Sequence, residues 1–277
     1  MALRTGKLAQ NILLYAALSV FTVFSLFPIV WTFLTSLKTP VEAFSMPPTF
    51  LFTPHWENYL TAWSLRDFSK AYMNTMVISL GATALTLVLS TPAAYSLARF
   101  RFRGADTFSF WLLVTRMLPE MLFIIPLFVI YQTLHLYDTL WGMMIIYQIY
   151  GVPFSTWIMK SFIQDIPREI EESALVDGCS SLGVLMRITL PLSASGLAAT
   201  AALAFIGVWV DLLFALSFTF TNAKMVSVAI ASFKGYAATQ WPIMAAGSIL
   251  AIVPQIMFFV FVQKYIVRGL TFGALKA

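Results

Sequence analysis

The feature that most constrains the fold of this chain is a series of apolar runs longer than the core helices of a soluble domain. The first run, from Ile12 to about Leu34, exceeds the roughly 20 apolar residues that a helix needs to cross a bilayer. Of the 277 residues, 60% are hydrophobic and only 10% are charged, whereas soluble domains carry about 25% charged residues. The sequence therefore predicts an all-α membrane protein.

Six apolar runs can be separated, and we expect each to form one transmembrane helix of a single domain covering residues 1–277. The first run is preceded by Arg4 and Lys7, is too long for a signal peptide and lacks a small-residue cleavage site, so we interpret it as an uncleaved span. Gly151 and Pro153 predict a break in the fourth span, and such breaks commonly line a cavity. The expected spans are at about 12–34, 71–98, 107–134, 139–163, 195–220 and 242–262.

The distribution of basic residues predicts the orientation. With six spans both termini lie on one side, and eleven of the 17 Lys and Arg residues fall on that side. Because cytoplasmic loops are enriched in Lys and Arg, we expect both termini in the cytoplasm. The larger group comprises Arg4, Lys7, Arg99, Arg101, Arg103, Lys160, Arg168, Arg187, Lys264, Arg268 and Lys276. The smaller group comprises Lys38, Arg66, Lys70, Lys224 and Lys234, while Arg116 lies within a span.

A polar stretch at 165–191 interrupts the second half of the chain and is expected to form a cytoplasmic helical hairpin. Asp165 and Pro167 are signals for the start of a first helix, and Asp177-Gly178 is a signal for its end. Ser180 or Ser181 can cap a second short helix that ends at Pro191. The apolar residues expected to share a face are Ile166, Ile170 and Ala174 on the first helix, and Leu182, Leu185 and Met186 on the second. A solvated loop is the alternative.

The hairpin resembles the EAA motif of ABC importer permeases, the loop that couples a membrane subunit to its ATPase. The matching residues are Glu172-Ser173-Ala174, Asp177-Gly178 and Ile188-Thr189-Leu190-Pro191, with Ser173 and Cys179 replacing residues that are usually Ala. The resemblance implies the type I importer permease fold with an EAA-type coupling hairpin. The coupling residues that it implies are Glu171, Glu172, Ala174, Asp177, Gly178, Leu182 and Pro191.

Other segments are similar to the carbohydrate-uptake branch of these permeases, which includes the smaller membrane subunit of the maltose transporter. They are Phe27-Pro28, Ser36-Leu37-Lys38, Ala98–Gly104, Leu136–Thr139 and Gly269–Ala274. The branch usually has Trp-Asn-Glu in its fifth span, where this chain has Trp209-Val210-Asp211. The resemblance implies import of an oligosaccharide, sugar, polyol or sugar phosphate across a bacterial or archaeal plasma membrane. It also implies a heterodimer with a second permease, two ATPase subunits and an extracytoplasmic sugar-binding protein.

Composition excludes several other classes of function. One cysteine and two histidines leave no ligand set for a metal site, and no Walker A pattern occurs. We therefore expect a non-catalytic chain that binds no cofactor, with ATP and Mg²⁺ bound by the partner ATPase. The alternating basic turn at Arg99–Arg103 fits a positive-inside anchor at the end of a span, and no cluster of basic and aromatic residues indicates a nucleic-acid site, so nucleic acid is not an expected partner.

Arg116 and Glu120 lie four residues apart in the expected third span, which places them on one helix face. Charges within a membrane usually pair, face the bundle interior and mark a pathway. Together with Trp209 and Asp211 they are candidates for contact with a hydroxyl-rich substrate. A structural ion pair between Arg116 and Glu120, and simple packing of Trp209, remain alternatives.

The polar segment 221–241 is expected to be an external loop. By its position in the resembling permeases it would contact the binding protein through Asn222, Lys224, Lys234 and Tyr236, although an ordinary interfacial loop would have the same composition. Two rival functions remain open, namely a permease for amino acids or peptides and a secondary transporter that uses Glu120 and Asp211 as proton-coupling carboxylates. A membrane enzyme is disfavoured because no nucleophile and base are paired in the spans.

Overall fold

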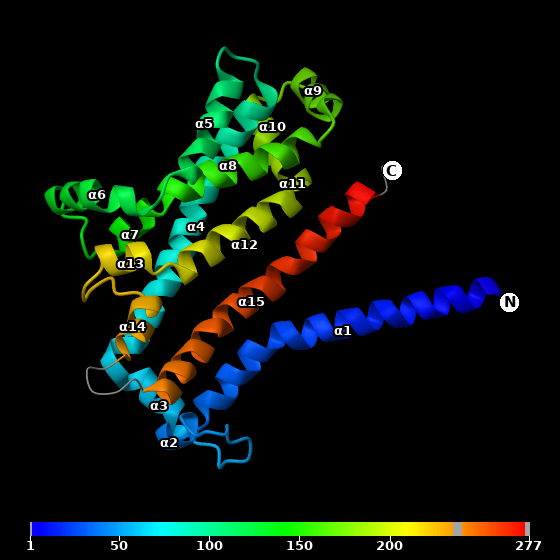
Figure 1. Cartoon of the computed structure of the whole chain (residues 1–277). Helices are drawn as coiled ribbons and strands as arrows, with labels where there is room; N and C mark the ends of the chain where they lie inside the picture. The colour runs from blue at the N-terminus through cyan, green and yellow to red at the C-terminus, as the bar shows by residue number, and fades with distance from the viewer. Residues whose placement is uncertain (1, 235–239, 275–277) are drawn as a thin grey trace. The chain divides into compact units, whose positions relative to one another are not determined.

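The computed structural model describes residues 2–234 and 240–274, with side chains described at 11–234 and 240–264 (Figure 1). These ranges are almost entirely helical and contain no β-strand, so the all-α prediction is confirmed. The helices form two compact units, Met1–Phe68 with Ile230–Ile252, and Ser69–Ala229 with Val253–Ala277.

The first unit contains α1 (Ala2–Ser36), α2 (Pro40–Ala43), α3 (Glu57–Ser64), the 3₁₀ turn η1 (Leu65–Asp67) and the first part of α15 (Trp241–Ala274). Phe68 and Phe233 stack in its interior with ring centroids 5.8 Å apart. By contrast, the most apolar stretch of α1 is unburied, and among Asn11–Ser36 only Ser36, at the end of the helix, is buried. A helix that is apolar on all sides and unburied is suited to lipid or to a partner subunit.

The second unit contains most of the remaining helices. They are α4 (Phe68–Arg99), α5 (Ala105–Met117), α6 (Met121–Thr133), α7 (Leu140–Ile146), α8 (Gln148–Gln164), α9 (Arg168–Val176), α10 (Ser181–Val184), the π-helical turn η2 (Leu185–Thr189), α11 (Leu190–Leu192), α12 (Ala194–Val210), α13 (Leu213–Phe218) and the start of α14 (Val226–Ser232). Within this unit α5 and α12 both pack against α8. Figure 1 shows α9 and α10 at one end of the unit and α6, α7 and α13 at the other.

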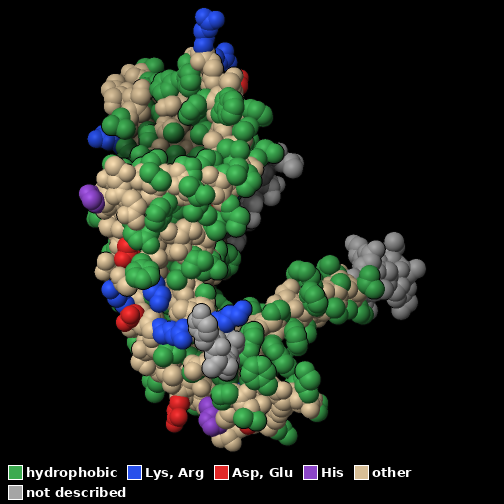
Figure 2. Space-filling view, turned by 60° about the vertical axis from the view of Figure 1, so that its left-hand side comes forward, with side chains coloured by type: hydrophobic (Ala, Val, Ile, Leu, Met, Phe, Trp, Pro, Cys, Tyr) green, Lys and Arg blue, Asp and Glu red, His purple; other side chains and the backbone are tan. Residues whose placement is uncertain are grey.

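Three helices of the described ranges are long and apolar enough to cross a membrane alone, namely Asn11–Ser36, Glu57–Arg99 and Trp241–Lys264. Two further pairs of consecutive helices, each with a sharp bend between its members, are long and apolar enough when each pair is taken as one segment. These pairs are α5 with α6 and the α10–α11 segment with α12, so the structure offers up to five spans within the described residues. Figure 2 agrees with a membrane location, because hydrophobic side chains are spread over much of the visible surface and charged side chains form a few small groups. The expected count of six spans stays a prediction.

The expected third span is not one continuous helix. It ends as α5 at Met117 and resumes as α6 at Met121, and the two axes differ by 96°. The break surrounds Pro119, which cannot donate a backbone hydrogen bond and disfavours helical backbone in the residue before it. The fifth span is broken as well, at Asp211 and Leu212 between α12 and α13.

The predicted break at Gly151 and Pro153 is wrong, because α8 runs through both residues and the fourth span is interrupted earlier, at Tyr147. Gly151 instead permits close packing. A Cβ atom at this position would lie 2.8 Å from Oγ1 of Thr86 on α4, closer than real Cβ contacts. Small residues at such crossings are typical of membrane helix packing.

Two apolar clusters hold the second unit together. One joins α4, α6, α7 and α13 through Ile78, Tyr131, Ile146, Phe214 and Phe218, among others. The other joins the end of α4 to α8 and η2 through Ala94, Tyr95, Ala98, Met159, Ile163 and Leu185. Because Leu185 belongs to the polar stretch 165–191, this second cluster joins that stretch to α4 and α8.

Candidate functional site

The polar stretch at 165–191 forms the expected helix, turn and helix. Pro167 precedes the first residue of α9, and Gly178 follows its end with φ of +89°, a conformation that Gly adopts at little cost. Ser180 caps α10, because its Oγ accepts the backbone N–H of Gly183 at 3.2 Å. Asp165 does not cap α9; it follows the last residue of α8.

The base of the hairpin is an ion pair that sequence reasoning did not find. Arg99, the last residue of α4, donates from Nε to Oε2 of Glu171 at 2.7 Å, and both side chains are less than one tenth exposed. Oε1 of the same carboxylate accepts the hydroxyl of Thr189 at 2.8 Å. Because a buried charge is stable only when it is paired and hydrogen-bonded, these contacts fix the hairpin to α4.

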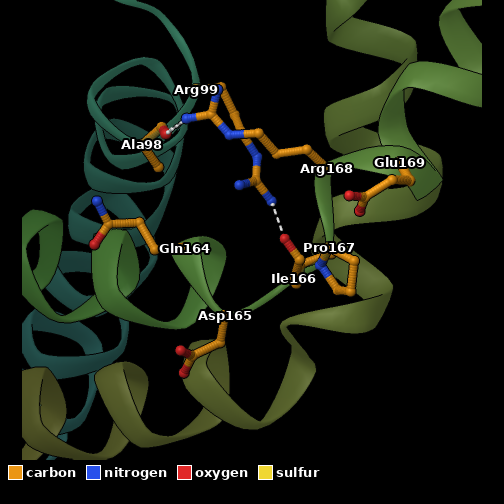
Figure 3. A pocket seen from close by; sticks show the side chains of 8 residues that line it. All are labelled: Ala98, Arg99, Gln164, Asp165, Ile166, Pro167, Arg168 and Glu169. Atoms are coloured by element: carbon orange, nitrogen blue, oxygen red, sulfur yellow. Dashed lines mark hydrogen bonds between the residues drawn. The ribbon is translucent and has the colours of Figure 1, made fainter.

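Arg99 also satisfies the polar backbone between α8 and α9. Its Nη2 donates to the carbonyls of Ile163 at 2.7 Å and Ile166 at 2.9 Å. Arg168 reaches back in the opposite direction and donates to the carbonyl of Ala98 at 3.2 Å. Figure 3 shows these two crossing arginines above an open pocket of about 450 Å³ that Asp165 and Glu169 also line.

The face of the hairpin that points away from this base carries Glu172, which is exposed next to the buried Glu171. Several apolar side chains of the hairpin are likewise exposed among the described residues, including Val176 at 87% and Leu182 at 67%. This differs from the expected apolar stripes. Ala174, Ile166 and Leu185 are buried, whereas Ile170, Leu182 and Met186 are exposed because Glu171 and Val184 take the inner face.

The break between α5 and α6 changes the geometry expected for Arg116 and Glu120. Because the helix stops between them, the four-residue spacing does not place them on one face, and within the described residues they form no ion pair within 4.0 Å. Arg116 is exposed, and its guanidinium lies over two rings of α8, 4.5 Å from the centroid of Phe154 and 5.9 Å from that of Tyr150. Such cation–π contacts hold the guanidinium while its edge stays available.

Asp211 and Trp209 lie at the second break, between α12 and α13. Oδ2 of Asp211 accepts the hydroxyl of Tyr147 at 2.8 Å and the backbone N–H of Ala215 at 3.0 Å, so it caps the start of α13. Trp209 is buried and packs edge-on against Tyr72, with the ring centroids 5.8 Å apart. Both residues therefore support the backbone at the break.

In the expected external loop, Asn222 is exposed and Lys224 is half-buried. The backbone carbonyls of both residues accept a hydrogen bond from Nδ2 of Asn74. Lys234 is exposed, and Tyr236 lies outside the described residues. The start of this segment is held by Asp138, a residue that sequence analysis noted only as part of a resembling segment. Burial acts to raise the pKa of Asp138, but hydrogen bonds from the backbone of Phe220, Asn222, Ala223 and Thr221 outweigh it and lower the pKa to about 2.

Comparison with known proteins identifies the family. The sequence model of one protein family, described as the binding-protein-dependent transport system inner membrane component, matches residues 86–272 of this chain. The chain belongs to this family. The chain is therefore a membrane transport subunit and not an enzyme, as expected from its resemblance to ABC importer permeases.

Similar proteins cover nearly the whole chain. It is 34% identical to the sulfoquinovosyl glycerol transport system permease protein of Agrobacterium fabrum, over 95% of this chain and 93% of that protein. It is 32% identical to the trehalose/maltose transport system permease protein of Thermococcus litoralis, over 98% of both chains. The fold is similar to that of a bacterial ABC transporter involved in import of the acidic polysaccharide alginate, with a TM-score of 0.75 at 22% identity over 92% of this chain and 95% of the other. The type I permease architecture is thereby supported.

Proposed function

We propose that this chain is the membrane-spanning permease subunit of an ATP-driven ABC importer that carries a carbohydrate into the cytoplasm. The observation that carries the proposal is full-length similarity to permeases named for carbohydrate transport, one for trehalose and maltose and one for sulfoquinovosyl glycerol. The substrate class is an oligosaccharide, sugar, polyol or sugar phosphate. The family name supports delivery of this substrate by a binding protein.

The assembly that fits this function contains a second, related permease, two ATPase subunits and an extracytoplasmic sugar-binding protein. This chain would contribute six spans with both termini in the cytoplasm, which the excess of basic residues on that side supports. ATP and Mg²⁺ bind to the ATPase subunits. The unburied apolar surface of α1 supports a location against lipid or the second permease.

The hairpin α9–α10 is the proposed coupling element. Its inner face is fixed to α4 by the pair of Arg99 and Glu171, so a displacement of the hairpin moves α4 with it. Its outer face offers Glu172 within an exposed apolar surface, which suits docking in a groove of the ATPase. ATP-driven closure of the two ATPases would then reach the spans as a rigid-body movement. Ala174, Asp177, Gly178 and Pro191 maintain the shape of the hairpin.

The proposed substrate pathway passes the break between α5 and α6. Arg116 stands over aromatic rings there with its guanidinium exposed, and Glu120 follows the break. Arginine, carboxylate and aromatic groups together suit a hydroxyl-rich substrate, because they offer donors, acceptors and an apolar stacking surface. Trp209 and Asp211 would shape the second break of the pathway. On the external side, Asn222, Lys224, Lys234 and Tyr236 would face the binding protein.

The decisive experiment is purification of the N-terminally tagged chain from its native membrane, followed by identification of the proteins that accompany it. Recovery of a second permease and an ATPase, lost on Glu172→Lys, is the expected result. Proteoliposomes of this complex should then accumulate radiolabelled trehalose, maltose or a related sugar only with ATP inside. A chain that is recovered alone, and whose uptake stops with a protonophore instead of with ATP removal, would refute the proposal.

A further inference from the structure

The external segment 219–226 has no regular secondary structure over most of its length, yet its backbone is held from two sides. The first side is the turn between α6 and α7. The Asp138 carboxylate there accepts the backbone N–H groups of Phe220 at 2.9 Å, Thr221 at 3.1 Å, Asn222 at 2.9 Å and Ala223 at 3.0 Å. The Asp138 N–H in turn donates to the carbonyl of Phe218 at 3.0 Å.

The second side is the start of α4. Asn74 donates from Nδ2 to the carbonyls of Asn222 at 2.8 Å and Lys224 at 3.1 Å. Thr75 accepts the N–H of Val226 through Oγ1 at 2.7 Å, and Lys70 donates to the carbonyl of Thr221 at 3.2 Å. The Asp138 carboxylate thus binds the backbone donors of 220–223, while α4 binds three backbone acceptors through Asn74 and Lys70 and one donor, that of Val226, through Thr75.

This arrangement fixes the backbone and leaves the side chains of Phe220 and Asn222 exposed, whereas the Thr221 hydroxyl donates to Oδ2 of Asp138 at 3.2 Å. Successive N–H groups converging on one anion form a nest, and bonds to a charged acceptor are stronger than neutral ones. The side chains of Thr221 and Asn222 are exposed, and Phe220 is 73% exposed although it is a large aromatic. An exposed aromatic on a backbone that is already ordered is a favourable anchor, because binding loses little conformational entropy.

We propose that Asp138 is a positioning residue that pre-organises the segment 219–223 as the surface on which this chain receives its solute-binding protein. The inference rests on the proposed function. It is supported by the location of α6, α7 and α13, the helices that flank Asp138 and precede the segment, away from the hairpin helices α9 and α10 within the second unit, which is the external side if the hairpin is cytoplasmic (Figure 1). The extracytoplasmic partner of this family is a binding protein.

A purely structural role for Asp138 would affect assembly or maximal activity, whereas a positioning role affects the affinity for the binding protein. The test uses the complete complex in nanodiscs, with the solute-binding protein recovered by crosslinking to that complex as the probe. ATP hydrolysis is titrated with this protein, giving a half-saturating concentration and a maximal rate. Amide hydrogen exchange at 219–226 reports directly on the backbone.

For Asp138→Ala we expect faster exchange of the four amides, a half-saturating concentration raised roughly tenfold and a maximal rate within about twofold of wild type. Asp138→Asn keeps one acceptor oxygen and should give a smaller change in the same direction. Asn74→Ala removes hydrogen bonds to the segment from α4. It should likewise raise the half-saturating concentration and leave the maximal rate nearly unchanged, so the test remains possible if the Asp138 variants fail to assemble. Asp67→Asn, at an exposed carboxylate, is the matched control for loss of one charge.

Unchanged half-saturation in the Asp138 and Asn74 variants that assemble would overturn the inference, as would a lower maximal rate at constant half-saturation. Wild-type ATPase activity that does not respond to the binding protein would instead overturn the proposed function. The two failures are therefore distinguishable.

Discussion

Nε of Arg99 lies 2.7 Å from Oε2 of Glu171, so the last residue of α4 and the first turn of α9 form one buried ion pair across 72 positions of sequence. Thr189 adds a hydrogen bond from the far end of the hairpin. Both arms of the hairpin therefore meet on one carboxylate. This gives the hairpin a fixed orientation on α4, while the neighbouring Glu172 remains exposed.

The first prediction separates the stability of the hairpin from its coupling function. Glu171→Gln should lower the free energy of unfolding by about 3 kcal/mol, because it leaves the buried Arg99 without its charged partner. Glu172→Gln, one residue further on, should change it by less than about 0.5 kcal/mol. Thermal unfolding of the purified complex and limited proteolysis of 165–191 measure the difference. Equal stability of the two variants would contradict the buried pair.

The second prediction concerns coupling itself. Glu172→Lys should leave insertion of the chain in the membrane intact but weaken docking of the ATPase and reduce ATP-driven sugar uptake by roughly tenfold or more, because the reversed charge faces the docking surface of the ATPase. Uptake into proteoliposomes and the ATP hydrolysed per sugar are the measurements. Glu169→Lys, which makes the same charge change in the first turn of the same helix, is the control. Normal uptake by the Glu172 variant would remove the coupling assignment.

The sequence was a good guide wherever local rules decide the structure. Gly178 ends α9 and Ser180 caps α10, because turn and cap preferences depend on a few neighbouring residues. It was a poor guide to contacts between distant residues. Glu171 was expected only as one of the coupling residues that the resemblance implies, since nothing near it in sequence indicates that Arg99 lies beside it.

The prediction that Arg116 and Glu120 lie on one helix face was wrong for a different reason. Their spacing argument assumed an unbroken helix, whereas Pro119 stands between them and the chain bends by 96° there. Conversely, Gly151 and Pro153 were expected to break α8, but a proline is tolerated within a membrane helix when packing satisfies the freed carbonyl. The outcome at each proline depends on tertiary packing, which the sequence pattern does not contain.

The third prediction tests the close crossing of α4 and α8. Gly151→Ala should destabilise the chain by about 1–3 kcal/mol, because the new Cβ would lie 2.8 Å from Oγ1 of Thr86. Gly207→Ala is the matched control, since its Cβ would have no neighbour within 4 Å. Thermal unfolding of both variants gives the comparison. The double variant Thr86→Ala with Gly151→Ala should be less destabilised than the sum of the single changes, and strict additivity would contradict the contact.

The fourth prediction uses the lowered pKa of Asp138. A carboxyl whose folded-state pKa is below its unfolded value stabilises the fold above the unfolded pKa, and this contribution is lost as the pH falls towards the folded value, here about 2. Protection of the amides at 220–223, corrected for intrinsic exchange, should therefore stay constant from about pH 7 to 5 and decrease only below about pH 4. Asp138→Asn should lack this acid transition. Loss of protection already near neutral pH in the wild type would contradict hydrogen bonding of these amides to the Asp138 carboxylate.

The last prediction concerns the pathway at the break between α5 and α6. Arg116→Ala removes the guanidinium that stands over Phe154, together with up to five hydrogen-bond donors. If the substrate passes there, transport at saturating binding protein should fall about tenfold while stimulation of ATP hydrolysis persists, because docking and coupling occur elsewhere. Glu120→Gln should act in the same direction by removing an ionised acceptor. Arg103→Ala, at an exposed basic residue between α4 and α5, should leave transport unchanged. Arg116 and Glu120 form no ion pair, so a loss of transport in both variants would not come from breaking one shared stabilising contact. If the Arg116 and Glu120 variants both assemble and transport normally, the pathway would instead lie in the second permease.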